Sequence, residues 1–375
     1  MKPSRHLVFH VPALIGGGAE RVCVLMANEM ARRGHKVTLL VWNKDGPNAD
    51  MVDHKVRLVS LDLAAHHGKF GKIRTLLGVL KTGLFLRRES PDAVFAYLEF
   101  ANALTAISLL AAGSRALFFP SYHAAAELQV RGLAYKVIKL FDRLTIKRAT
   151  RAIGVSAGIG RDLVKRGFDP GNVVVIHNPV TCHARLNPEP YAWEAALAAF
   201  GAGPVIITLG RLVSVKDHQT LLRAFSRLAP SRAAKLVVFG EGPLLSNLES
   251  LAYSLGISDR VLFAGYVNDP AACYACGDIF VLSSRTEGFG NALVEAMTFG
   301  LSVVSTDAPY GPREILDHGK FGELVPVGDA DALAKAIDRA IEASHDREAL
   351  KARARDFDIT AIGEQYERLC FNVRG

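Results

Sequence analysis

Short runs of apolar residues alternate with segments of helical periodicity along almost the whole chain. The runs are rich in Val, Ile, Leu and Phe and mostly lack polar alternation, which predicts strands buried on both faces. Because helical segments lie between many of them, the order is typical of βαβ units with parallel sheets. The predicted strands are residues 6–11, 36–42, 93–98, 116–119, 152–156, 173–177, 205–209, 235–239, 261–264, 279–282 and 302–306.

The rhythm breaks once, near residues 181–190, where Pro188 and Pro190 interrupt regular structure. A chain of 375 residues exceeds one ordinary core, and one single sheet would need an unusual number of strands. We therefore expect two Rossmann-like, doubly wound α/β domains, residues 1–185 and 186–355, followed by a helix in residues 356–375 that crosses back onto the first domain. Such folds bind ligands at the carboxyl ends of their strands, which predicts a site in an interdomain cleft.

Charge divides the chain into unlike halves. Residues 1–190 hold 27 Lys and Arg against 14 Asp and Glu, whereas the remainder holds 18 against 23. A basic half suits an anionic membrane surface, a phosphate-bearing acceptor or a nucleic acid. Nucleic acid is disfavoured because the basic half has no helix-turn-helix, RRM or zinc pattern. Neither a transmembrane run nor a secretory signal is recognisable, so we expect a cytoplasmic protein.

Metal chemistry is not indicated. The five cysteines are scattered, which points to a reducing compartment. Cys273 and Cys276 form a lone CxxC without a second pair and are interpreted as core or helix residues. The DxD spellings at residues 329–331 and 356–358 lie late in the chain and are interpreted as chance.

Gly16, Gly17 and Gly18 follow the first predicted strand and precede an apolar helix. Glycine lets backbone approach a ligand, and a helix N-terminus favours an anion. The spacing fits neither a P-loop nor GxGxxG, and a plain flexible turn remains an alternative.

Two cations, Arg211 and Lys216, follow the strand at residues 205–209. The planar fork of Arg and the point charge of Lys can together grip a diphosphate. A solvated loop would look similar.

The most specific pattern begins with Glu287-Gly288-Phe289-Gly290-Asn291 and continues to a second glutamate, Glu295. It follows the strand at residues 279–282 and opens a helix, so its glycines free the amides of Phe289, Gly290, Asn291 and Ala292 to face an anion. Glu295 lies about one turn inside the helix, where it can accept hydrogen bonds from a ribose diol. The alternative makes both glutamates ordinary helix charges.

These segments together resemble the EX7E glycosyltransferases of GT-B family 4. The likeness lies in the Glu287–Glu295 run and in Gly210-Arg211-Leu212 with Lys216. It extends, in the family's order, to residues 16–21, 155–156, 176–180 and 240–244. The resemblance covers nearly the whole chain.

The resemblance implies a retaining transfer from a nucleotide-diphosphate sugar, usually UDP-linked, without a required metal. It implies that Arg211 and Lys216 hold the diphosphate, that Glu295 binds the ribose and that Glu287 lies beside the donor sugar. The family often places a histidine after the strand at residues 116–119, which makes His123 the candidate for contact with the reacting sugar. A structural histidine is the alternative. Asp217 stands where the family most often has glycine, which puts the shape of that loop in doubt.

Two basic segments of the first half predict helices that can lie on anionic lipid. One carries Lys136, Lys139, Arg143 and Lys147 on a single face. The other, residues 69–88, has an apolar stripe flanked by Arg74, Lys81 and Arg88; the stripe consists of Ile73, Leu76, Leu77, Leu80 and Leu84. In the alternative, each is a core-facing helix with a solvated basic face.

We therefore expect a peripheral glycosyltransferase on the inner face of the cytoplasmic membrane, with a lipid-linked, polysaccharide or lipopolysaccharide acceptor. One alternative is an epimerase of UDP-N-acetylglucosamine with the same fold, which should lack the Glu287–Glu295 run. Another is a non-catalytic nucleotide-sugar-binding protein that anchors a membrane assembly.

Overall fold

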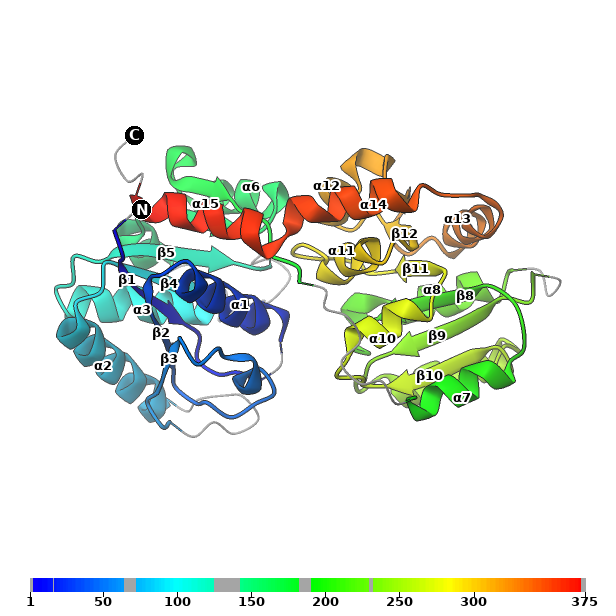
Figure 1. Ribbon diagram of the computed structural model, residues 1–375, viewed down its shortest axis with the longest axis horizontal. Coiled ribbons are helices and arrows are strands. Elements are labelled where there is room, and N and C mark those ends of the chain that lie inside the picture. Colours follow the sequence, from blue (N-terminus) through cyan, green and yellow to red (C-terminus); the bar gives the residue numbers. More distant parts are fainter. Residues whose placement is uncertain are drawn as a thin grey trace. The chain divides into compact units, whose positions relative to one another are not determined.

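The chain forms two compact units (Figure 1). A computed structural model describes residues 3–15, 17–63, 72–124, 142–181, 190–228 and 232–371. Unit 1 comprises Met1–Pro179 and Ile359–Gly375, and unit 2 comprises Val180–Asp358. The expected boundary at residues 185/186 lies outside the described residues. Because the chain re-enters unit 1 at Ile359, the last helix packs on the first helix of the chain.

Unit 1 contains a parallel sheet in the order β3-β2-β1-β4-β5-β6-β7. The order reverses between β1 and β4, which makes their carboxyl ends a topological switch point. The predicted strands of this half are confirmed, whereas β3 escaped prediction because it is a half-exposed edge strand. The strands are β1 (His6–His10), β2 (Lys36–Val41), β3 (Arg57–Ser60), β4 (Ala93–Tyr97), β5 (Leu117–Tyr122), β6 (Ala152–Gly154) and β7 (Val173–Val175).

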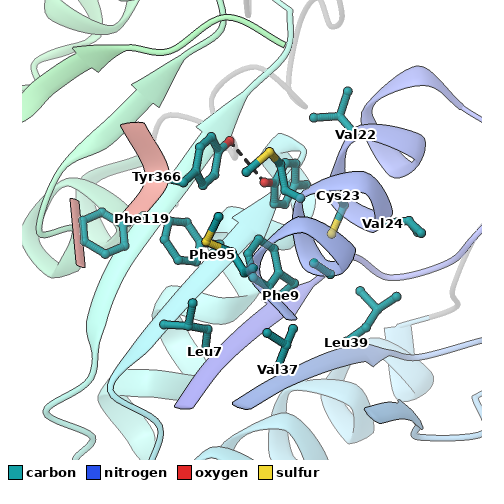
Figure 2. Close-up of a cluster of buried hydrophobic side chains, with 14 of the residues drawn as sticks. Leu7, Phe9, Val22, Cys23, Val24, Val37, Leu39, Phe95, Phe119 and Tyr366 are labelled. Carbon is teal, nitrogen blue, oxygen red and sulfur yellow. Dashed lines mark hydrogen bonds between the residues drawn. The ribbon is translucent and has the colours of Figure 1, made fainter. Parts of the chain in front are cut away.

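Alternation along the strands supplies side chains to both faces of this sheet. On one face, Phe95 stacks between Phe9 and Phe119 with ring centroids 5.0 and 4.9 Å apart, and Tyr366 of the last helix lies beside it (Figure 2). The other face packs Val8 and its neighbours against α2 and α3. The helices of unit 1 are α1 (Gly18–Arg32), η1 (Ala49–Met51), α2 (Lys72–Glu89), α3 (Glu99–Ala111), α6 (Ala157–Arg166), η2 (Pro170–Asn172) and α15 (Ile359–Phe371).

Unit 2 repeats the plan with the order β10-β9-β8-β11-β12-β13, again parallel, and its switch point lies between β8 and β11. Its predicted strands are confirmed; the three-residue β13 was too short to predict. The strands are β8 (Val205–Leu209), β9 (Lys235–Phe239), β10 (Val261–Gly265), β11 (Ile279–Leu282), β12 (Ser302–Thr306) and β13 (Glu323–Val325). The helices are α7 (Ala192–Ala199), η3 (Ser214–Lys216), α8 (His218–Phe225), α9 (Leu245–Ser254), α10 (Pro270–Ala275), α11 (Asn291–Thr298), α12 (Pro312–Ile315), η5 (Asp317–Gly319), α13 (Ala330–Glu342), α14 (Arg347–Ala354) and η6 (Arg355–Phe357). The predicted class, two doubly wound α/β domains, is confirmed.

Candidate functional site

The switch point of unit 2 gathers the residues that the sequence marks most sharply. Strands β8 and β11 are direct neighbours, with Ile206 paired to Ile279. The loop after β8 carries Arg211 and Lys216, and the loop after β11 carries Glu287 and leads into α11. Two segments about seventy residues apart in sequence therefore meet at one edge of one sheet.

Lys216 and Glu287 form an ion pair at the centre of this edge. The Lys216 Nζ lies 2.6 Å from the Glu287 Oε1, and the Ser284 hydroxyl donates to the same oxygen over 2.6 Å. The lysine side chain is 26% exposed and the glutamate 11%. Among the described residues, both side-chain donors to Glu287 reach Oε1, so the carboxylate is fixed through one oxygen. The ammonium has three N–H donors and can serve a second acceptor.

Arg211 is exposed at the same edge. Its loop is shaped by a second loop, because the Leu212 amide donates to the Glu241 carbonyl over 2.8 Å. Gly240 has φ +130°, and a Cβ there would overlap the Gly210 carbonyl. Residues 240–244, which the sequence offered only as part of the family likeness, thus support the loop that presents Arg211.

Asp217 takes the backbone conformation that glycine would favour, with φ 48° and ψ 44°. Its carboxylate accepts a hydrogen bond from Thr220 over 2.9 Å and lies 3.0 Å from the guanidinium of Arg285. These contacts hold the left-handed turn. Aspartate therefore forms the turn at a position where the family most often has glycine, and the doubt about the shape of this loop is removed.

The start of α11 also uses a left-handed glycine, Gly290, at φ 109°. The side chain of Phe289 is 2% exposed and packs edge-on against Phe357 at 5.4 Å. Phe289 can therefore serve a ligand only through its backbone. Asn291 and Ala292 are the first residues of the helix and are half-buried, which leaves their amides at its positive end.

Glu295 lies one turn further along α11 and is 8% exposed. The hydroxyl of Tyr274, which is fully buried in α10, donates to the Glu295 Oε2 over 2.8 Å. Tyr274 was not predicted as a site residue, because its place beside Glu295 arises only when α10 and α11 pack on the same sheet. Its hydrogen bond orients the carboxylate.

The glycine turn of unit 1 lies at the carboxyl end of β1. Gly17 caps α1 and Gly18 is its first residue, while Gly16 lies outside the described residues. The carboxylate of Glu20 folds back against Gly17. The N-terminus of α1 therefore already holds a negative group of the chain itself.

His123 follows β5 in unit 1. Its Nε2 lies 3.0 Å from the Ser121 hydroxyl, and its ring lies tilted against Tyr97 with centroids 5.4 Å apart. Its Nδ1 has no hydrogen-bond partner among the described residues. Burial lowers the pKa of His123 to about 3, so the imidazole is neutral near pH 7. A neutral ring with one unused nitrogen can exchange a hydrogen bond with a sugar hydroxyl.

No group of three or more His, Cys, Asp or Glu within the described ranges is placed to hold a metal ion. Cys273 and Cys276, at the end of α10, donate to the backbone carbonyls of Asp269 and Cys273, and burial raises the pKa of both thiols. Among the helices described, none is long and apolar enough to cross a bilayer.

The two basic segments differ in how much of them is described. Lys136 and Lys139 lie outside the described residues, whereas Arg143 and Lys147 are exposed on the helical stretch 142–148. In α2 the apolar stripe faces solvent, because Ile73 is 78% exposed and Leu84 69%. The alternative of a core-facing stripe in this helix is therefore wrong.

Comparison with known proteins shows the family to which this chain belongs. Residues 192–357 match "Glycosyl transferases group 1" and residues 17–179 match "Glycosyl transferase 4-like domain". The lipopolysaccharide core biosynthesis glycosyltransferase LpsE of Rhizobium meliloti (strain 1021) is 31% identical over 94% of this chain and 95% of that protein.

A second relative is the Campylobacter jejuni enzyme N-acetylgalactosamine-N,N'-diacetylbacillosaminyl-diphospho-undecaprenol 4-alpha-N-acetylgalactosaminyltransferase. It is 35% identical over 42% of this chain and 44% of that one. The crystal structure of Anabaena Alr3699/HepE in complex with UDP and glucose superimposes with a TM-score of 0.79 at 20% identity, covering 98% of this chain and 99% of that one. With motifs, fold and full-length similarity in agreement, the chain belongs to the group 1 glycosyltransferases of GT-B fold.

Proposed function

We propose that this glycosyltransferase moves a hexosyl group from a UDP-sugar to a lipid-linked or lipopolysaccharide acceptor, with retention of anomeric configuration. The observation that carries the proposal is the Lys216–Glu287 pair at the unit 2 switch point, beside Arg211 and the amino end of α11. The relatives support the acceptor class, because one acts in lipopolysaccharide core biosynthesis and another on a diphospho-undecaprenol glycan.

In the proposed complex, Arg211 and Lys216 bind the donor diphosphate together with the amides of residues 289–292. Lys216 and Glu287 cancel in formal charge, so the exposed Arg211 supplies the net positive charge. Glu295, oriented by Tyr274, accepts hydrogen bonds from the ribose diol. Glu287 presents its Oε2 to a hydroxyl of the donor sugar, and the neutral imidazole of His123 is the candidate for a hydrogen bond to the reacting sugar.

The reaction breaks the bond between the anomeric carbon and the phosphate oxygen and forms a bond to the acceptor oxygen. Negative charge grows on the leaving UDP, where Arg211, Lys216 and the helix amides stabilise it. The acceptor attacks from the face that the UDP leaves, and its proton passes to the departing diphosphate. These protein cations replace a metal ion, and the chain works at the cytoplasmic face of the membrane, where its basic half meets anionic lipid.

Incubation of the full chain with radiolabelled UDP-sugars and a bacterial lipid extract tests the proposal. We expect label to enter the lipid fraction, to persist with a metal chelator and to disappear in the Glu287→Ala variant. Epimerised nucleotide sugar without transfer would favour the epimerase alternative, and UDP-sugar binding without turnover on any extract would favour the non-catalytic one.

A further inference from the structure

Helix α2 (Lys72–Glu89) buries Phe85, Leu86 and several small residues, and it exposes a row of other large apolar residues. Its inward face contains Gly78 and Gly83: a Cβ at Gly78 would overlap the Trp42 ring at 2.5 Å, and one at Gly83 would lie 3.3 Å from the Ser108 carbonyl. Thr82 accepts a hydrogen bond from the Trp42 Nε1 over 3.0 Å, and the Ser108 hydroxyl donates to the Val79 carbonyl. Small side chains therefore let α2 lie close against its neighbours.

The outward face is correspondingly apolar. Its exposed positions recur every three or four residues, which places them on one side of the helix. Five of them are apolar: Ile73 (78% exposed), Leu76 (61%), Leu77 (43%), Leu80 (52%) and Leu84 (69%). We call this set the α2 stripe. A soluble monomer rarely exposes so continuous an apolar row, so the stripe marks a contact surface.

Positive charge accompanies the α2 stripe. Lys81, Arg87 and Arg88 are exposed on the same side of the helix, and residues 63–88 contain six Lys and Arg but no Asp or Glu. Glu89, at the end of the helix, is neutralised by Arg57 and Arg88 over 3.0 and 3.1 Å. Two copies of this face would bring like charges together, whereas an anionic bilayer offers both apolar chains and negative headgroups.

We propose that α2 lies in the plane of an anionic bilayer, with the α2 stripe in the boundary between headgroups and acyl chains. Lys81, Arg87 and Arg88 then meet the lipid phosphates, as cations do on helices that lie in a membrane interface. This inference rests on the membrane location proposed above and assigns α2 as the lipid contact; the contact itself needs neither donor nor acceptor.

Co-sedimentation of the full chain with phosphatidylcholine vesicles, with and without phosphatidylglycerol, tests the inference. The variant is Leu76→Gln with Leu80→Gln and Leu84→Gln, and the matched control is Tyr253→Gln, an apolar residue 82% exposed on α9 of unit 2. We expect the triple variant to bind anionic vesicles about tenfold more weakly or worse. The control should bind as the unaltered chain does, and salt should weaken binding in both.

Calorimetric UDP affinity of the triple variant reports whether its unit 2 site is intact, and its thermal midpoint reports whether unit 1 is folded; we expect both to be unchanged. The inference is overturned if the unaltered chain ignores anionic vesicles, if the triple variant binds them equally well, or if neutral vesicles bind as tightly. It is also overturned if the unaltered chain is a dimer that the triple substitution dissociates, since a second copy would then cover the stripe. If the chain did not bind vesicles, the proposed UDP site would still stand. If the chain did not bind UDP, the proposed lipid contact of α2 would still stand.

Discussion

Two substitutions that break the same ion pair separate a diphosphate contact from a purely structural one. Lys216→Met removes the ammonium from the Lys216–Glu287 pair and keeps much of the side-chain volume, whereas Glu287→Gln removes the carboxylate charge and leaves the lysine. Both lose the charge attraction across 2.6 Å. If Lys216 binds the diphosphate, the two variants must differ in UDP affinity although they resemble each other in stability.

The structure sets the magnitudes. Breaking a fully buried pair costs about 3–5 kcal/mol and an exposed pair about 0.2–1 kcal/mol. Lys216 is 26% exposed, and Ser284 still donates to Glu287 when the lysine is gone. We therefore expect each variant to lose about 1–2 kcal/mol in the free energy of unfolding of unit 2.

The UDP affinities should diverge. A hydrogen bond to a charged partner contributes about 1.5–3 kcal/mol, so Lys216→Met should weaken UDP binding roughly 10- to 100-fold. Glu287→Gln frees the ammonium from its own carboxylate, and UDP affinity should be unchanged or higher. Urea unfolding and calorimetry measure the two quantities on the same samples. Equal losses of UDP affinity in both variants would refute the reasoning, because they would show that the pair only supports the loop.

Three further predictions address single groups. Calorimetry should show that the unaltered chain prefers UDP to 2'-deoxy-UDP and that Glu295→Ala removes this preference; a preference that survives the change would exclude the ribose contact. Asp217→Ala should lower the free energy of unfolding, measured with urea, by about 1–3 kcal/mol, because alanine at φ 48° is strained and the contacts with Thr220 and Arg285 are lost. Asp217→Gly should lower it by less, because glycine adopts this conformation without strain. Equal losses in the two variants would contradict the role of backbone strain. Burial lowers the pKa of His10 to about 4 from an unfolded value near 6.5, so the unfolded chain binds the proton more readily and stability falls as pH drops from about 6.5 towards 4. His10→Gln should reduce this slope by at most about 1.4 kcal/mol per pH unit, as followed by urea titrations between about pH 7 and pH 5, and an unchanged slope would show that His10 does not titrate there.

The local pattern was enough to predict the site loops of unit 2. Arg211, Lys216 and Glu287 follow strands that the sequence marks clearly, and parallel strands bring their carboxyl ends to one edge. That Lys216 and Glu287 touch was not predicted, because their loops are adjacent only through the strand order β8-β11. The role of Tyr274 was not predicted for a related reason: its partner Glu295 lies on another helix, 21 residues away.

The sequence by itself determined the class of fold, since unbroken apolar runs alternating with helical segments can bury their side chains only in parallel sheets covered on both faces. It also singled out the candidate residues for the proposed chemistry, because these glycines, cations and carboxylates directly follow predicted strands. Tertiary structure alone decided which residues touch and which side of α2 faces water. A helix with an apolar stripe looks as if it should bury that stripe. In α2, however, the opposite face packs inward through Gly78 against Trp42 and through Phe85 and Leu86, and the α2 stripe stays outside. Periodicity defines a face, whereas the shape of the neighbours selects the face that packs.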